Sequence, residues 1–178
     1  AAVVHDFAYG DIVFDGRRAG SFLAEPGAKV VGVEMFSMSK TYGMAGWRLG
    51  FVVGNAEIVS RLDLFADHAR VGIFTPVQQA GIAALTGPQD SVAERVETYR
   101  RRRDRVREVL PHVTAEGSFY LWWELPDGLT PERLLEHRVA VAPGEGFGSR
   151  GEGWARLSLA VTDEVLETGL ERLGRAIG

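Results

Sequence analysis

The apolar positions of the first ninety residues fall into short runs, and the first two runs end next to a polar side chain. Residues 3–5 form a short apolar strand that is followed by Asp6. Residues 28–36 are rich in β-branched and other apolar side chains, which predicts a buried strand that ends at Ser37. A further apolar run covers residues 47–53. The pattern therefore predicts strands that deliver polar residues at their carboxyl ends.

Helical signals begin after this apolar run. Asn55 can cap a helix that extends to about Phe65. Thr75-Pro76 is a helix start, with proline at the first helical position, and Gly87-Pro88 is the corresponding stop. The longest predicted helix covers residues 91–110, where apolar side chains recur at helical spacing. Its candidate buried positions are Val92, Val96, Tyr99, Val106 and Leu110.

The remainder of the chain alternates short strands and helices. Strands are predicted for residues 120–125, 139–142 and 155–161, and a short helix is predicted for residues 131–137. Thr162 can cap a C-terminal helix. The order predicts an α/β protein in two parts: a half of parallel strand–loop–strand type, then a long connecting helix that leads into a compact α+β half.

Composition and charge narrow the class of protein. Acidic residues outnumber basic ones, 24 against 20, and the formal net charge of −4 argues against nucleic acid as a partner. No apolar run approaches the length that spans a bilayer, so no membrane partner is expected. The chain contains no cysteine, which excludes disulfides and thiolate metal sites. Without a basic and apolar leader, the expected location is the cytoplasm.

Lys40 is the first candidate for chemistry. It directly follows the predicted strand of residues 28–36, at the kind of position where open α/β sheets bind ligands. A lysine amine can hold the aldehyde of pyridoxal 5'-phosphate covalently. Asp6 can pair with the pyridinium nitrogen of that cofactor, and the Tyr9 hydroxyl can hydrogen-bond its phenolic oxygen. An amine, an acid and a phenol on separate segments are groups that such a site requires.

Three further residues complete the candidate set. Ser37 and Arg48 suit a phosphate, because a hydroxyl at a tight turn and a guanidinium both donate to anions. The alternative for Ser37 is a hydroxyl that satisfies the backbone at the strand end. Arg156 lies in an apolar strand, where an unpaired charge is costly, so it requires an anionic partner.

Other conspicuous residues are interpreted as structural. Residues 94–108 carry six arginines between positions 100 and 107 and four acids, which predicts a solvated helix face with ion pairs at helical spacing. The acids are Glu94, Glu97, Asp104 and Glu108. The four histidines have no metal-ligand spacing, so no metal site is predicted. Residues 122–123 and Trp154 are expected to pack in the core or between domains. The glycine-rich residues 144–148 are expected to turn the chain near Arg156.

Five short motifs together follow the pattern of a known family. They are residues 4–11, 39–42, 44–48, 117–119 and 141–144. At these positions the chain resembles the fold-type I aminotransferases of class I/II, and within them the bacterial glutamine- and methionine-type transaminases. The match runs from Val3 to Ile177 and corresponds to the C-terminal part of such an enzyme. It implies that residues 1–90 are part of the large cofactor-binding domain, a mixed sheet with helices. Residues 91–178 would be the connecting helix and the small C-terminal α+β domain.

The resemblance also implies an activity. A pyridoxal-phosphate-dependent aminotransferase moves an amino group between an L-amino acid and a 2-oxo acid. Lys40 would be its catalytic lysine, and Arg156 would bind the α-carboxylate of the substrate. The implied cofactor-binding residues are Asp6, Tyr9, Ser37, Lys40 and Arg48. The complete enzyme is expected to be a homodimer. Because the phosphate-cupping loop and the ring-stacking aromatic belong to the rest of such an enzyme, we expect this chain alone to fold at least partly without transaminating.

Two other classes of function remain open at this point. The same groups would serve a β-lyase or a decarboxylase of the same fold, because the orientation of the α-carbon bonds decides which bond breaks. Arg156 favours a substrate that keeps its carboxylate, which disfavours decarboxylation. The second class is a non-catalytic remnant, or a regulatory module of the kind fused to DNA-binding regions.

Overall fold

The computed structural model describes residues 1–110, 112–113 and 115–178. The chain forms two compact units, Ala1–Glu94 and Arg95–Gly178. Helix α5 (Asp90–Val109) contains the boundary between them. Within the described ranges, no helix combines the length and the apolar character that crossing a membrane requires.

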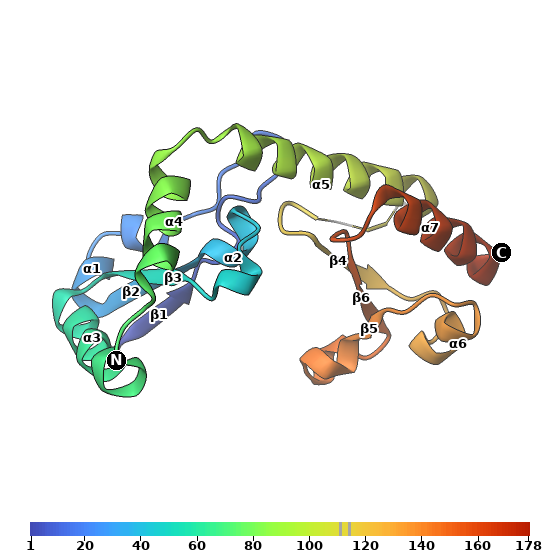
Figure 1. Ribbon diagram of the computed structural model, residues 1–178. Helices are drawn as coiled ribbons and strands as arrows, with labels where there is room; N and C mark the ends of the chain where they lie inside the picture. Colours follow the sequence, from blue (N-terminus) through green and yellow to red (C-terminus); the bar gives the residue numbers. More distant parts are fainter. Residues whose placement is uncertain (111, 114) are drawn as a thin grey trace. The chain divides into compact units, whose positions relative to one another are not determined.

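A three-stranded mixed sheet forms the centre of the first unit. Its strands are β1 (Val3–Asp6), β2 (Gly32–Ser37) and β3 (Gly50–Gly54), in the order β1-β2-β3 (Figure 1). The β1–β2 pair is parallel and the β2–β3 pair is antiparallel. Because parallel strands run in the same direction, the carboxyl ends of β1 and β2 lie at the same edge of the sheet. The α/β fold class predicted from the sequence is confirmed.

The predicted strand of residues 28–36 is wrong in its first half. Residues Ala28–Val31 form a short helix, α1, and the strand begins only at Gly32. Gly27 precedes α1 with a φ of 81°, a left-handed conformation that glycine adopts without steric cost. Val30 is 74% exposed, so its β-branched side chain contributed an apolar signal without being buried. Local composition therefore extended the predicted strand beyond the residues that the sheet pairs.

The boundaries of the next elements also differ from the predicted ones. Trp47 belongs to a 3-10 turn, η2 (Ala45–Trp47), and the strand starts at Gly50 instead of residue 47. A Cβ at Gly50 would lie 2.6 Å from the carbonyl oxygen of Phe36, so glycine allows this close pairing with β2. A single turn of helix, α2 (Met38–Thr41), lies between β2 and η2 and carries Lys40.

Two longer helices follow β3 in the first unit. Asn55 caps α3 (Ala56–Arg70) as predicted, since its side-chain oxygen accepts the N–H of Ile58 at 3.0 Å. The helix continues past Phe65 and ends where Val71 adopts a φ of 59°. Helix α4 (Thr75–Thr86) has the predicted bounds, with proline in its first turn and Gly87 at its end. Helix α3 packs against β2 and β3.

The second unit is built on an antiparallel sheet. Its strands are β4 (Tyr120–Glu124), β5 (Ala142–Pro143) and β6 (Trp154–Ser158), in the order β4-β6-β5. Strand β5 is much shorter than the predicted strand of residues 139–142, because only Ala142 and Pro143 pair with β6. Helix α6 (Pro131–Glu136) and the 3-10 turns η3 (Gly144–Phe147) and η4 (Ser149–Gly151) connect these strands.

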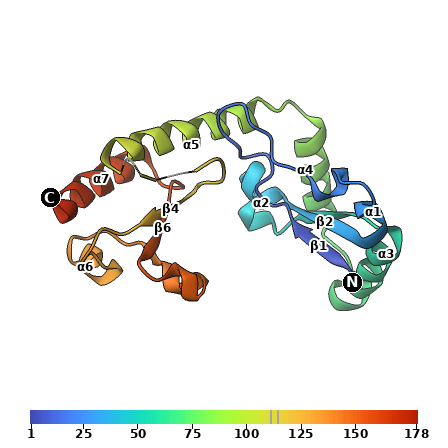
Figure 2. The same cartoon turned by 180° about the vertical axis from the view of Figure 1, so that it is seen from behind.

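Helix α7 (Asp163–Ile177) lies alongside α5 in the second unit (Figure 2). Thr162 caps α7 as predicted, with its hydroxyl oxygen accepting the N–H of Val165 at 3.3 Å. Ion pairs join the two helices, including Arg102 to Asp163 at 2.7 Å. The predicted solvated face of α5 is wrong at Arg103, which is 2% exposed and donates to Asp104 and to the Ala115 carbonyl. Apolar core positions of this unit include Val106, Leu121, Leu134, Leu159 and Leu170.

A buried carboxylate fixes β1 against β2 in the first unit. Glu34 is paired in register with His5, and its carboxylate contacts the His5 Nδ1 at 2.9 Å and the Ser21 hydroxyl at 3.0 Å. Burial by itself raises the pKa of Glu34, but hydrogen bonds from His5, Ser21 and two backbone amides outweigh it and hold that pKa below its ordinary value. Glu34 is therefore ionised at neutral pH. The contact holds the residue next to Asp6 at a fixed place in the sheet.

Candidate active site

The turn that carries Lys40 is tied to the end of β2 by its own backbone. Ser37 caps α2, with its Oγ accepting the N–H of Ser39 at 3.3 Å. The N–H of Met38 donates to the carbonyl oxygen of Leu49 at 3.1 Å, and the Met38 side chain is 1% exposed. These contacts fix the short helix between β2 and β3. Lys40 is therefore presented, half-buried, from the carboxyl end of β2.

Lys40 and Tyr9 are neighbours in space although thirty-one positions separate them. The Lys40 Nζ lies 5.6 Å from the centroid of the Tyr9 ring. A hydrogen bond beside them joins the same two segments, because the Thr41 hydroxyl donates to Asp11 Oδ2 at 3.2 Å. Thr41 is 1% exposed and Asp11 is exposed, so this hydrogen bond joins a buried hydroxyl to a surface carboxylate. The sequence interpretation gave no role to the Asp11–Thr41 contact, which holds the tyrosine loop against the lysine turn.

Asp6 lies at the edge of the sheet from which Lys40 is presented. It is paired with Met35 in the parallel β1–β2 ladder. Ser37 follows Met35 by two positions, so Asp6 and Ser37 project from the same face of the sheet. The Asp6 carboxylate is exposed and accepts the N–H of Ala8 at 3.2 Å, which fixes the start of the loop to Tyr9.

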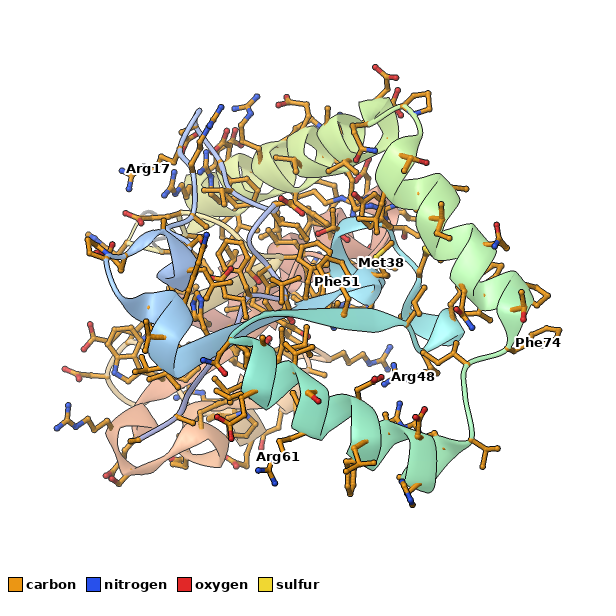
Figure 3. The ribbon with its side chains drawn as sticks, turned by 90° about the vertical axis from the view of Figure 1, so that its left-hand side faces the viewer. Arg17, Met38, Arg48, Phe51, Arg61 and Phe74 are labelled. Atoms are coloured by element: carbon orange, nitrogen blue, oxygen red, sulfur yellow. The ribbon has the colours of Figure 1, made fainter. Side chains whose placement is uncertain are left out.

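Arg48 approaches the same edge from β3. It ends the turn η2 with a φ of 52°, an uncommon left-handed conformation for a residue with a long side chain. Two positions later, Gly50 pairs with Ser37, so the backbone places Arg48 close to the turn of Lys40. The Arg48 guanidinium is exposed and donates to the Ala45 carbonyl at 3.2 Å (Figure 3). It contacts its own turn in this structure, and its remaining N–H groups can donate to an anion.

Tyr42 adds a second phenol next to the lysine turn. Burial, and then the nearby negative charge of Asp11, raise the pKa of Tyr42 above its ordinary value. Its hydroxyl donates to Gln89 Oε1 at 3.1 Å. Tyr42 therefore stays protonated and acts as a hydrogen-bond donor to the residue that precedes α5.

Arg156 belongs to the second unit and lies in the middle of β6. Its Cζ is 4.0 Å from the centroid of the Tyr120 ring and 4.6 Å from the centroid of the Phe147 ring. Phe147 comes from η3, so the glycine-rich residues 144–148 do turn next to this arginine, as predicted. The sequence analysis predicted neither ring contact. Tyr120 and Phe147 lie on other segments than Arg156, and the pattern of apolar residues does not show which segments meet.

The groups of the first unit fit pyridoxal phosphate as a ligand. An amine and a phenol lie together, and an acid and a hydroxyl project from the same face of the sheet at its carboxyl edge. Arg48 adds a cation near that hydroxyl. These are the donors and acceptors that the aldehyde, phenolic oxygen, pyridine nitrogen and phosphate of the cofactor require. A mixed α/β sheet with this set is typical of the fold-type I transferases that use pyridoxal phosphate.

The comparison with known proteins agrees with this class. The chain belongs to the family "Aminotransferase class I and II", whose model matches residues 1–173. Aminotransferases of this family use pyridoxal phosphate. The membership predicted from the short motifs is therefore confirmed.

Several curated relatives and solved structures are similar to the chain. It is 45% identical to an L-glutamine–4-(methylsulfanyl)-2-oxobutanoate aminotransferase of Bacillus subtilis, over 97% of this chain and 46% of the relative. It is 44% identical to an LL-diaminopimelate aminotransferase of Dehalococcoides mccartyi, over 97% and 47%. The substrate-bound BacF structure from Bacillus subtilis superposes with a TM-score of 0.91 at 38% identity, over 98% of this chain and 47% of that one. The chain thus spans about half the length of the curated relatives it matches.

Proposed function

We propose that this chain, in the full-length protein, takes part in pyridoxal-phosphate-dependent amino transfer between an L-amino acid and a 2-oxo acid. The observation that carries the proposal is the arrangement of Lys40 beside Tyr9, at the sheet edge where β1 delivers Asp6. Relatives with more than 40% identity, whose names give them as aminotransferases, support the reaction type.

In the proposal, each candidate site residue of the first unit holds a different part of the cofactor. Asp6 pairs with the pyridine nitrogen and keeps it protonated, because a nearby negative charge raises that nitrogen's pKa. The Tyr9 hydroxyl donates to the phenolic oxygen. Ser37 and Arg48 donate to the phosphate, and the guanidinium fork matches two of its oxygens at once. When bound, the cofactor supplies an aldehyde for the amino group and a ring that withdraws electrons from the substrate's α-carbon.

Lys40 holds the cofactor and then moves a proton. Once the substrate amine displaces it, the Lys40 Nζ is a free base next to the α-carbon. It removes the α-proton and delivers a proton to the carbon that receives the amino group. Arg156 binds the α-carboxylate, so the substrate keeps that group throughout.

A labelling experiment tests the assignment of Lys40. The sequence contains two lysines, Lys29 and Lys40, so the possible attachment sites are few. We expect borohydride reduction of the full-length holoenzyme, followed by peptide mass mapping, to place the pyridoxyl group on Lys40. Lys29 is exposed on α1 and provides an internal control within the same chain. Label on Lys29, or on no residue of this chain, would contradict the proposed function.

We also propose that the full-length protein is a homodimer. Helices α3 and α4 and the segment between them expose large apolar side chains, among them Phe65 at 72%. Phe74 is 74% exposed and points away from the rest of the unit (Figure 3). Exposed apolar side chains favour burial against other protein surface, and the proposal assigns this face to a second copy of the protein. We expect sedimentation equilibrium of the full-length protein to give twice the monomer mass. Replacing Phe74 with serine should weaken the association, and a wild-type monomer at micromolar concentration would contradict the proposal.

A further inference from the structure

The side chains around Arg156 come from one face of the antiparallel sheet. Arg156 is directly opposite Trp122, and Trp154 is directly opposite Glu124. Trp122 and Trp154 stack with ring centroids 6.0 Å apart and an interplanar angle of 12°. Phe147 contacts Trp122 edge-on, with centroids 5.5 Å apart. The Phe147 ring is therefore held by two strands, although its own backbone belongs to the turn η3.

The guanidinium of Arg156 contacts aromatic rings, whereas other arginines of this unit form ion pairs with carboxylates. Arg102 and Arg105 of α5 pair with carboxylates of α7 at 2.7 Å. Among the residues that the structure describes, no carboxylate pairs with Arg156, and its guanidinium instead lies over the Tyr120 and Phe147 rings. Aromatic faces attract a cation through the charge distribution of the ring, without accepting its in-plane N–H groups. The fork of N–H donors therefore stays available to an external anion.

We infer that Tyr120 and Phe147 are positioning residues that hold the Arg156 guanidinium ready for the α-carboxylate of the substrate. The inference rests on the proposed function, because it assigns the external anion to the amino acid and the 2-oxo acid. A long arginine side chain in solvent samples many rotamers, and fixing it on binding costs conformational entropy. The two rings restrict the guanidinium before the substrate arrives. The same rings add no negative charge that would compete with a carboxylate.

The inference predicts a loss of binding that leaves the chemical step intact. In the full-length holoenzyme, we expect Phe147→Leu to raise the KM for the amino acid and for the 2-oxo acid about fivefold to tenfold, as loss of a cation–π contact would. Turnover at saturating substrate should change by less than about twofold, because Lys40 and the proton transfer are untouched. Tyr120→Leu should have the same effect. Steady-state kinetics with both substrates varied measures the two constants separately.

Two variants that keep an aromatic ring serve as matched controls. Tyr120→Phe and Phe147→Tyr should each retain a KM within about twofold of the wild type, since either ring still faces the cation. The decisive substitution is Phe147→Leu, because Phe147 is 53% exposed and its loss opens no cavity in the core. An unchanged KM in the Phe147→Leu enzyme would overturn the inference. A rise in KM that Phe147→Tyr shows equally would also overturn it.

The reference variant Arg156→Lys separates this inference from the proposed function. If Arg156→Lys raises the KM and Phe147→Leu does not, the rings are not positioning residues, while Arg156 remains the carboxylate ligand. If Arg156→Lys leaves the KM for both substrates unchanged, Arg156 is not the carboxylate ligand. The proposed role of Arg156 and the positioning role of the two rings are then both wrong. The inference holds if Arg156→Lys, Phe147→Leu and Tyr120→Leu each raise the KM. The two variants that keep an aromatic ring should leave the KM near the wild-type value.

Discussion

Replacing Lys40 with alanine in the full-length enzyme is expected to abolish amino transfer, with kcat/KM falling by at least about 10⁴-fold, the upper range for loss of a positioned acid–base group. Lys40 has two roles in the proposal, so one substitution removes both the attachment of the cofactor and the base for the α-proton. Because Asp6, Tyr9, Ser37 and Arg48 remain, the cofactor should still bind, although without a covalent link. Single-turnover measurements, with cofactor absorbance followed after adding an amino acid, report the loss directly.

The matched control is the other lysine of the chain. Lys29→Ala removes an exposed ammonium from α1, in the same unit and away from the sheet edge that presents Lys40. It should leave kcat and KM within about twofold of the wild type, as expected for a surface substitution. A Lys40→Ala enzyme that retains more than about a tenth of wild-type turnover would contradict the assignment, and so would a comparable loss in Lys29→Ala.

Features that depend on a few neighbouring residues were predicted well from the sequence. Asn55 and Thr162 cap their helices as expected, because a cap joins a side chain to a backbone N–H three positions away. The ends of α4 follow in the same way from Pro76 and Gly87. The position of Lys40 after a strand was also readable, because the apolar run before it is followed at once by hydroxyl-bearing residues.

Boundaries inside apolar runs were predicted less well, for a physical reason. An apolar run of four to eight residues fits a strand or a buried helix turn equally, and only pairing decides between them. Val30 is β-branched and was assigned to the strand, but it is exposed on α1. The same ambiguity lengthened the predicted strand at residues 139–142, where β5 pairs through only two residues. Strand pairing is decided by contacts with segments that are distant in the sequence. Local composition carries no information about those contacts.

Contacts between distant segments were the part of the candidate site that the sequence could not supply. The Asp11–Thr41 hydrogen bond and the His5–Glu34 contact each join residues about thirty positions apart. Neither follows a periodicity, because each depends on the loop between β1 and β2 closing in one particular way. Residue types alone therefore indicated the cofactor chemistry, while the register of β1 against β2 determines which side chains support it.

Replacing Arg156 with lysine is expected to lower kcat/KM about tenfold to 100-fold for amino acids and 2-oxo acids alike, as loss of charge-assisted hydrogen bonds does. A lysine keeps the positive charge but offers a point donor, so it cannot hold both oxygens of a carboxylate in parallel. Its ammonium is also more strongly hydrated than a guanidinium, so it is less suited to the aromatic surroundings of Tyr120 and Phe147. The effect should be similar for donors with different side chains, because all of them share the α-carboxylate.

A panel of half-reactions with glutamine, methionine, alanine, aspartate and diaminopimelate measures that uniformity. Arg150→Lys is the matched control, since Arg150 is exposed on η4 of the same unit and the exchange preserves the net charge. It should leave every half-reaction within about twofold of the wild type. If Arg156→Lys affects only one donor, the arginine recognises a side chain. If no donor is affected, the carboxylate is bound elsewhere. If the Arg156 guanidinium binds the α-carboxylate that every substrate shares, Arg156→Lys should lower the half-reaction rate of every donor by a similar factor. Arg150→Lys should not lower it.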